Sequence, residues 1–142
     1  MRNRQEYRAE GGDFVSYYFN KILNVSFDEA VTKVVEALRK EGFGVLIDIN
    51  VRETLRKKLD VEFRNNRILG ACNPPFAHQA LQAEDKIGTM LACNVVVQEN
   101  PEGKVEVAAV DPVASMQAID NPKLRDIAGQ VRAKLKNVVD GL

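Results

Sequence analysis

Hydrophobic and polar residues follow one another in blocks that predict a first strand and then an amphipathic helix. Residues 14–23 are rich in aromatic and apolar side chains, which favours a β-strand. Ser26 and Glu29 form the Ser-x-x-Glu pattern of a capping box, which marks a helix start. Gly42 is typical of the residue that ends a helix. Between these signals, apolar residues recur at helical spacing: Ala30, Val31, Val34, Val35 and Leu38.

The middle of the chain predicts several short elements, each bounded by turn residues. Asn73-Pro74-Pro75 suits an N-cap residue followed by a helix start, and Asn73 is most simply explained as that cap. Asn100-Pro101-Glu102-Gly103 predicts a turn between the two strands of a hairpin. The expected strands are residues 43–49, 67–72, 89–99 and 104–110, and the expected short helices are residues 52–60 and 76–83.

A last amphipathic helix follows the hairpin and completes the predicted fold. Asp111-Pro112 ends the preceding strand and Asn121-Pro122 begins the helix. Two long helices with one apolar stripe each must bury those stripes, and an antiparallel sheet offers one face for both. We therefore expect an α+β two-layer sandwich with a mainly antiparallel sheet, whose strand order is left open. The stripe of the last helix is Leu124, Ile127, Ala128, Val131, Leu135 and Val138.

The composition is that of a single folded domain. A length of 142 residues with 45% hydrophobic side chains is enough to build a core without disulfide or metal staples. We expect one domain over residues 14–142, preceded by a polar, flexible arm over residues 1–13 that contains Gly11-Gly12. The chain is too apolar for disorder and, with two Cys, too cysteine-poor for a disulfide scaffold.

The charge balance argues against bulk electrostatic partners. Twenty basic and 20 acidic residues give no net charge, so neither nucleic acid nor a membrane is an expected partner. Residues 52–67 carry six basic and three acidic groups, residues 122–142 carry five basic and two acidic groups, and residues 82–120 carry seven acidic and two basic groups. The two basic segments are either a patch for an anionic partner or solvated helix faces. We interpret them as solvated faces, because no aromatic residues interleave for base stacking. No signal-like or membrane-length apolar segment is found, which favours the cytoplasm and reduced thiols.

Both Cys and the only His fall between residues 72 and 93. Cys72 precedes the predicted helix at Pro74, whose positive dipole end favours a thiolate. His78 falls in the first or second turn of the same helix. Cys93 sits in the next strand candidate, so the two sulfurs can lie close if the strands are neighbours.

Three hypotheses follow from these residues. The first is a binding module for a small ligand or a soft metal, zinc or copper, held by Cys72, His78 and Cys93 with a fourth ligand from water or Asp85. The second is a thiol-based redox or transfer enzyme that uses Cys72. The third is a structural or interaction protein in which both Cys are inert, buried hydrophobes and His78 lies on the helix surface.

Five ordered motifs also resemble one known family. They resemble the bacterial and archaeal family called domain of unknown function 302, and the resemblance covers about residues 14–120. The motifs are Ser26-Phe27-Asp28-Glu29-Ala30, Glu41-Gly42-Phe43-Gly44-Val45-Leu46, Leu69-Gly70-Ala71-Cys72-Asn73-Pro74, Cys93-Asn94-Val95-Val96-Val97 and Val110-Asp111-Pro112.

The resemblance implies a fold similar to the TATA-binding-protein type, with the order strand, helix, four strands, helix, and it implies a homodimer. It implies no established activity, and fold likeness alone gives no reason to expect DNA binding. Cys72, Asn73, Pro74 and Cys93 fall on recurring positions of the family, and His78 on a position that is often His. Ala92 departs from the pattern, because many members of the family have Pro there.

Overall fold

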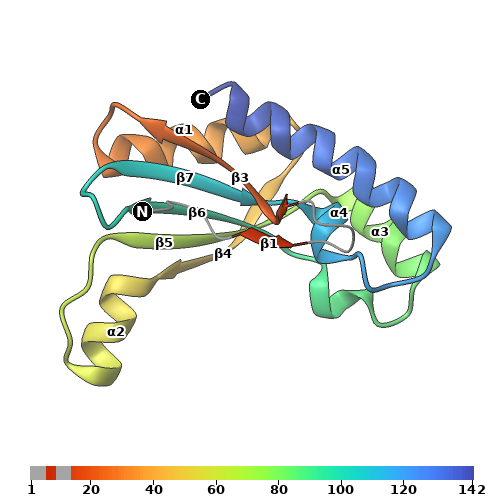
Figure 1. Ribbon diagram of the computed structural model, residues 1–142, viewed down its shortest axis with the longest axis horizontal. Coiled ribbons are helices and arrows are strands. Elements are labelled where there is room, and N and C mark those ends of the chain that lie inside the picture. Colours follow the sequence, from red (N-terminus) through yellow and green to blue (C-terminus); the bar gives the residue numbers. More distant parts are fainter. Residues whose placement is uncertain (1–5, 9–13) are drawn as a thin grey trace.

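The computed structural model describes residues 6–8 and 14–142, which form a five-stranded sheet, a small two-stranded sheet and several helices (Figure 1). The strands are β1 (Glu6–Arg8), β2 (Phe14–Ser16), β3 (Tyr18–Leu23), β4 (Gly44–Asn50), β5 (Asn66–Cys72), β6 (Cys93–Glu99) and β7 (Val105–Val110). The helices are α1 (Phe27–Lys40), α2 (Val51–Leu59), α3 (Pro74–Ala83), the 3₁₀ helix η1 (Ile87–Met90), α4 (Pro112–Ser115) and α5 (Pro122–Asp140).

The main sheet has the strand order β3-β7-β6-β5-β4, and every neighbouring pair is antiparallel. The first and last helices, α1 and α5, pack on one face of this sheet and against each other (Figure 1). The expected α+β two-layer sandwich is therefore confirmed. For the main sheet, which excludes β1 and β2, the order strand, helix, four strands, helix is also confirmed once the short helices between the strands are set aside. No helix in the described part of the chain is long and apolar enough to cross a membrane.

Alternation along the central strands decides which residues form the core. In β6, Cys93, Val95 and Val97 are buried against the helices, whereas the intervening Asn94 is exposed on the other face. The same alternation in β5 and β7 adds apolar side chains to the helix-facing side, where the stripes of α1 and α5 complete the core. These residues are Leu69, Ala71, Val107 and Ala109 from the strands, and Val34, Leu38, Leu124, Leu135 and Val138 from the helices.

Helix α1 begins and ends as the sequence predicts. The backbone N–H of Glu29 donates to Oγ of Ser26 at 3.2 Å, which is the capping bond of the expected box. At the other end, Gly42 adopts a φ of 87°, and the N–H of Phe43 donates to the carbonyl of Leu38 at 2.9 Å. This is a Schellman ending, which requires a left-handed residue and so favours Gly42. It also turns Phe43 into the core, where it is buried.

Two predicted strands are shorter than expected. The strand expected over residues 14–23 is interrupted at Tyr17, because the Ser16 hydroxyl donates to the carbonyl of Tyr18 at 3.0 Å and bends the chain. The strand expected over residues 89–99 begins only at Cys93. Its first part is η1, where the Thr89 hydroxyl donates to the carbonyl of Lys86 at 2.9 Å and stabilises a tight turn.

The predicted arm over residues 1–13 lies mostly outside the described residues. Within it, Glu6–Arg8 forms β1, which pairs with β2 in antiparallel register. The expected solvated helix over residues 52–60 is α2, and none of its residues is buried. It projects from the end of β4 and β5 at the lower left of Figure 1, beyond the layer formed by α1 and α5.

Candidate functional site

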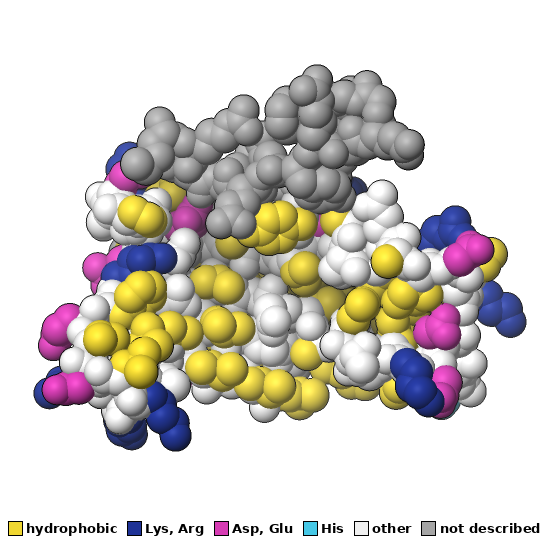
Figure 2. Space-filling model, turned by 60° about the horizontal axis from the view of Figure 1, so that its bottom comes forward, with side chains coloured by type: hydrophobic (Ala, Val, Ile, Leu, Met, Phe, Trp, Pro, Cys, Tyr) yellow, Lys and Arg dark blue, Asp and Glu magenta, His cyan; other side chains and the backbone are white. Residues whose placement is uncertain are grey.

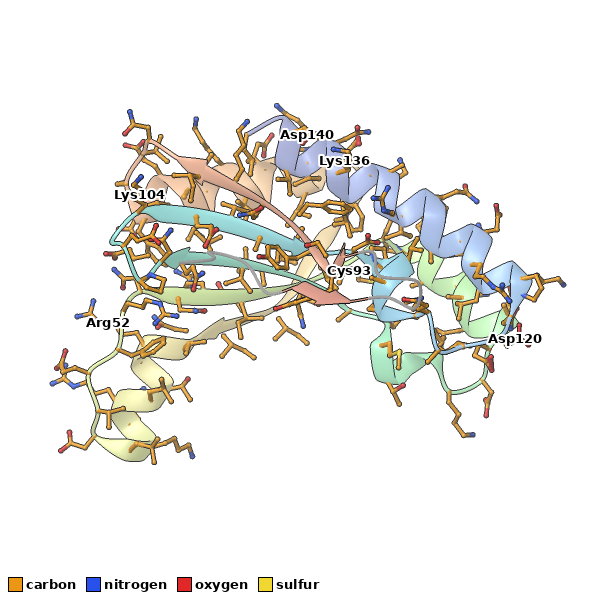
Figure 3. The ribbon with its side chains drawn as sticks, in the orientation of Figure 1. Arg52, Cys93, Lys104, Asp120, Lys136 and Asp140 are labelled. Carbon is orange, nitrogen blue, oxygen red and sulfur yellow. The ribbon has the colours of Figure 1, made fainter. Side chains whose placement is uncertain are left out.

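The two cysteines lie on neighbouring strands but face opposite sides of the sheet. Cys93 opens β6 and is the direct cross-strand partner of Ala71, so these two side chains share the helix-facing side. Cys72 follows Ala71 at the end of β5, and alternation turns it toward the other side. Both thiols are free, Cys93 buried and Cys72 half-buried. Figure 3 shows Cys93 at the end of the sheet that adjoins α3 and α4.

The buried position of Cys93 determines its protonation. Burial raises the pKa of the Cys93 thiol to about 11, and the nearby Cys72 thiol adds a smaller increase. Cys93 is therefore a neutral thiol at physiological pH, whereas the thiolate is the nucleophile and the metal ligand.

Asn73 and His78, the other predicted site residues, have different surroundings. Asn73 is the N-cap residue of α3 by position, but its side chain makes no capping bond. The expected cap is wrong in this respect, because Nδ2 of Asn73 donates to the carbonyl of Glu41 at 3.1 Å and ties α3 to the end of α1. His78 is exposed on α3.

The structure does not assemble the soft-metal site that the sequence suggested. Within the described ranges, no group of three or more His, Cys, Asp and Glu side chains lies close enough to hold a metal ion. Cys93 points into the core, whereas His78 points to solvent and Cys72 toward the opposite sheet face. The fourth expected ligand, Asp85, is exposed and pairs with Lys86. Alternation of side chains across one strand pair is what separates the two thiols.

Cys93 instead forms part of the wall of an apolar pocket between α3 and α5. Phe76 and Ala77 of α3 and Ile127 and Val131 of α5 line it, with Asn73 at one side. Its free space is about 400 Å³ when the open mouth is counted, and its enclosed part is about 30 Å³. Neither Cys72 nor His78 is among its lining residues. The pocket is therefore an apolar slot with a neutral thiol and one amide.

The sequence interpretation missed a second group of residues, on the sheet face that carries no helices. Glu106 is buried there among Asn20, Gln98 and Asn66. The alternation of apolar and polar residues along β6 and β7 contained a signal for this group. Gln98 and Glu106 interrupt otherwise apolar strands, and polar residues on one face of two adjacent strands predict either solvent or a polar site.

Comparisons with known proteins agree with this fold. The family model described as Domain of unknown function DUF302 matches residues 19–142. A solved structure, the crystal structure of an uncharacterized conserved DUF302 protein from Bacillus stearothermophilus, is 27% identical in sequence and superposes with a TM-score of 0.81. That match covers 87% of this chain and 96% of the other. No curated protein matches. Because the family model spans nearly the whole described fold, this chain belongs to the family of domain of unknown function DUF302.

Proposed function

We propose that this protein is a homodimeric small-ligand-binding module of the cytoplasm, with the slot between α3 and α5 as its ligand site. One observation carries the ligand site: the slot is lined by apolar side chains, with the Cys93 thiol and Asn73 as its few polar groups. Ligand pockets combine apolar walls with a small number of placed polar groups in this way. The raised pKa of Cys93 disfavours the alternative of a nucleophile in this slot.

The size of the slot limits the ligand to a small apolar group. Its enclosed part of about 30 Å³ holds little more than one water-sized group, so a larger ligand needs α3 to move away from α5. Helix α3 suits such a movement, because Ala80 is its only buried residue. We expect a short alkyl chain or a small ring to enter here, with the neutral thiol of Cys93 beside it.

Titration with hexanol and benzene, followed by NMR shifts of methyl groups, tests this ligand site. We expect both probes to shift the signals of Val131 and Ile127 in the wild-type protein. Ala128→Leu places added volume in the slot and should abolish those shifts. Ala133→Leu is the matched control, because Ala133 is exposed on the same helix. Equal shifts in both variants, or none in the wild type, contradict the proposal.

An unpartnered apolar surface supports the homodimer. We call it the β4–α2 surface, and it contains Leu46, Ile47, Ile49, Leu59 and Val61, all of which are exposed. Leu46 is 74% exposed, and a contiguous group of exposed hydrophobic residues of this kind marks an interaction surface. Figure 2 shows hydrophobic side chains over α2 at the left and along the front of the molecule. A nine-residue helix with no buried residue is marginal in water, so α2 needs a covering surface.

A second copy of the chain suits this surface better than an unrelated partner. β4 is the edge strand of the sheet, and beyond the irregularity between Val45 and Ile47 it offers a regular free edge. Two β4 strands from two copies of the chain can pair in antiparallel fashion about a twofold axis, because such an interface uses the same surface of each copy. This pairing also places the two basic α2 helices at opposite ends of the dimer interface, which keeps their like charges apart. Each α2 then reaches the exposed start of the partner's β4, where Gly44 leaves open space.

Sedimentation equilibrium tests this homodimer. We expect a dimer for the wild type at micromolar concentration and a monomer for Leu46→Lys, because a charge on the most exposed hydrophobic residue of the β4–α2 surface opposes association. Val113→Lys is the matched control, since Val113 is an exposed hydrophobic residue outside the β4–α2 surface. A monomeric wild type, or a dimer that survives Leu46→Lys, contradicts the proposal.

A further inference from the structure

The sheet face opposite the helices contains a buried carboxylate. Glu106 of β7 is only 4% exposed, although α1 and α5 both pack on the opposite face of the sheet. Nδ2 of Asn20 donates to its Oε2 at 2.9 Å, and Nε2 of Gln98 donates to its Oε1 at 3.0 Å. Both carboxylate oxygens therefore accept from neutral amides of the two flanking strands, β3 and β6.

The hydrogen-bond chain continues to β5 and has a direction. Asn66 is the cross-strand partner of Gln98, and its Nδ2 donates to Oε1 of Gln98 at 3.2 Å. Amide N–H groups thus point from Asn66 to Gln98 and from Gln98 to Glu106. The Oδ1 atom of Asn66 is buried and has no hydrogen-bond partner. The atom that lacks a hydrogen-bond partner at this end of the network is therefore an acceptor.

The network also lacks positive charge. Among the side chains that the structure describes, no Lys, Arg or His forms an ion pair with Glu106. A carboxylate has about four acceptor sites, and the two amides occupy one on each oxygen. Burying a charge is costly unless a partner of opposite sign compensates it. The site is therefore complementary to a cationic hydrogen-bond donor.

A groove gives such a donor access to the carboxylate. Its volume is about 460 Å³, which is within the range of roughly 300–1,000 Å³ of small-molecule sites. Val96 and Ala108 contribute apolar surface to it, beside Glu106. Tyr17 and Tyr18 line it too, and their rings meet edge to face at a centroid distance of 4.9 Å. Aromatic rings next to a carboxylate are a favourable environment for an organic cation.

We infer that this groove binds a small organic cation, an ammonium or guanidinium compound with a short apolar body. The cationic N–H groups donate to Glu106, and the apolar body lies against Val96 and Ala108. This site is separate from the α3–α5 slot. Val95 of β6 faces the helices, whereas the next residue, Val96, lines the groove on the other face.

Titration with n-butylammonium, n-butylguanidinium and neutral n-butanol tests the inference. Binding is followed by backbone NMR shifts and by the side-chain carboxyl carbon signal of Glu106. We expect both cations to shift that signal and the amides of Asn94, Val96 and Ala108, and to bind at least tenfold more tightly than butanol. Equal affinities for butylammonium and butanol, or shifts confined to the α3–α5 slot, would overturn it.

Two charge-removing variants separate the site from general electrostatics. Glu106→Gln should lower the butylammonium affinity at least tenfold and leave butanol unaffected. Glu102→Gln removes the same charge from an exposed turn and should change neither affinity. If Glu106→Gln does not fold, Asn94→Asp at the exposed groove wall provides the second test and should raise the affinity for butylammonium. Unchanged butylammonium binding in whichever of these two variants folds would overturn the inference.

Discussion

Asp111 and Arg132 join the end of β7 to the middle of α5. Oδ2 of Asp111 accepts from Nε of Arg132 at 3.1 Å, while Oδ1 accepts from the backbone N–H of Val113 at 3.0 Å. One carboxylate therefore caps α4 and holds α5 at the same time. The guanidinium of Arg132 also lies over the ring of Phe19 at 4.9 Å, so the contact extends to β3. Because α5 supplies one wall of the slot, this pair positions the proposed ligand site.

Removing the Asp111 carboxylate should destabilise the fold. Asp111→Ala loses both the cap and the ion pair of a nearly buried group, and we expect a loss of about 2 kcal/mol in the free energy of unfolding. Asp111→Asn keeps a capping oxygen and should lose about half as much. Urea unfolding measures both. Asp120→Asn, which breaks the exposed pair with Arg125, should leave stability unchanged. A loss in Asp120→Asn equal to that in Asp111→Ala would contradict this account.

The position of Gly70 favours glycine, because Ile47 occupies the space that a side chain would fill. A Cβ atom added at Gly70 would lie 3.0 Å from Cβ of Ile47, its cross-strand partner on β4. We expect Gly70→Val to lower the free energy of unfolding by about 1–3 kcal/mol through overpacking. Ile47→Gly in the same chain removes that Cβ atom and should recover much of the loss. Thermal unfolding of the two single variants and the double variant measures the coupling, and strictly additive effects would show that the contact is unimportant.

The Cys93 thiol should make stability depend on pH in the alkaline range. Burial raises its pKa to about 11 in the folded protein, whereas an unfolded thiol ionises near pH 8.5. Unfolding therefore releases a proton between these values, and stability is complete below about pH 8.5 and falls as pH rises toward 11. The total loss is on the order of 3 kcal/mol.

Urea unfolding from pH 7 to pH 10.5 measures this dependence. Cys93→Ala should flatten the alkaline decline, because the thiol whose pKa is raised by burial is removed. Cys72→Ala should retain most of it, since burial is the larger cause of the raised pKa and the Cys72 thiol the smaller. The same alkaline slope in the wild type and in Cys93→Ala would count against a buried, protonated thiol.

Asn73 should contribute more to stability than Asn137, although both amides bind Glu41. Nδ2 of Asn73 donates to the Glu41 carbonyl from a buried position, whereas Asn137 donates to the exposed Glu41 carboxylate at 3.0 Å. Asn73→Ala removes a hydrogen bond donated by a buried amide, and we expect a loss of about 1–2 kcal/mol. Asn137→Ala should cost less than about 0.5 kcal/mol. Guanidinium unfolding compares the two variants, and equal losses would show that burial of this bond is irrelevant.

Local patterns in the sequence were sufficient for most of the secondary structure. The Ser26–Glu29 box and Gly42 predict α1 because caps depend on a few neighbouring residues. The stripe from Leu124 to Val138 predicts α5 because burial follows the helical period. Errors arose where short polar side chains bent the chain locally, at Ser16 and Thr89, within stretches whose composition favours strands.

For the candidate site, the contributions of the sequence and of the tertiary structure are clearly separate. By itself, the sequence determined the fold class, the family and the cluster of Cys72, His78 and Cys93 along the chain, because these depend on order and periodicity. The tertiary structure decided which of these side chains meet. Pairing of Ala71 with Cys93 places Cys93 in an apolar slot and turns Cys72 to the other face. It also decided that Glu106, Gln98 and Asn66 form one row across the sheet, since cross-strand register is fixed only when the strands pair.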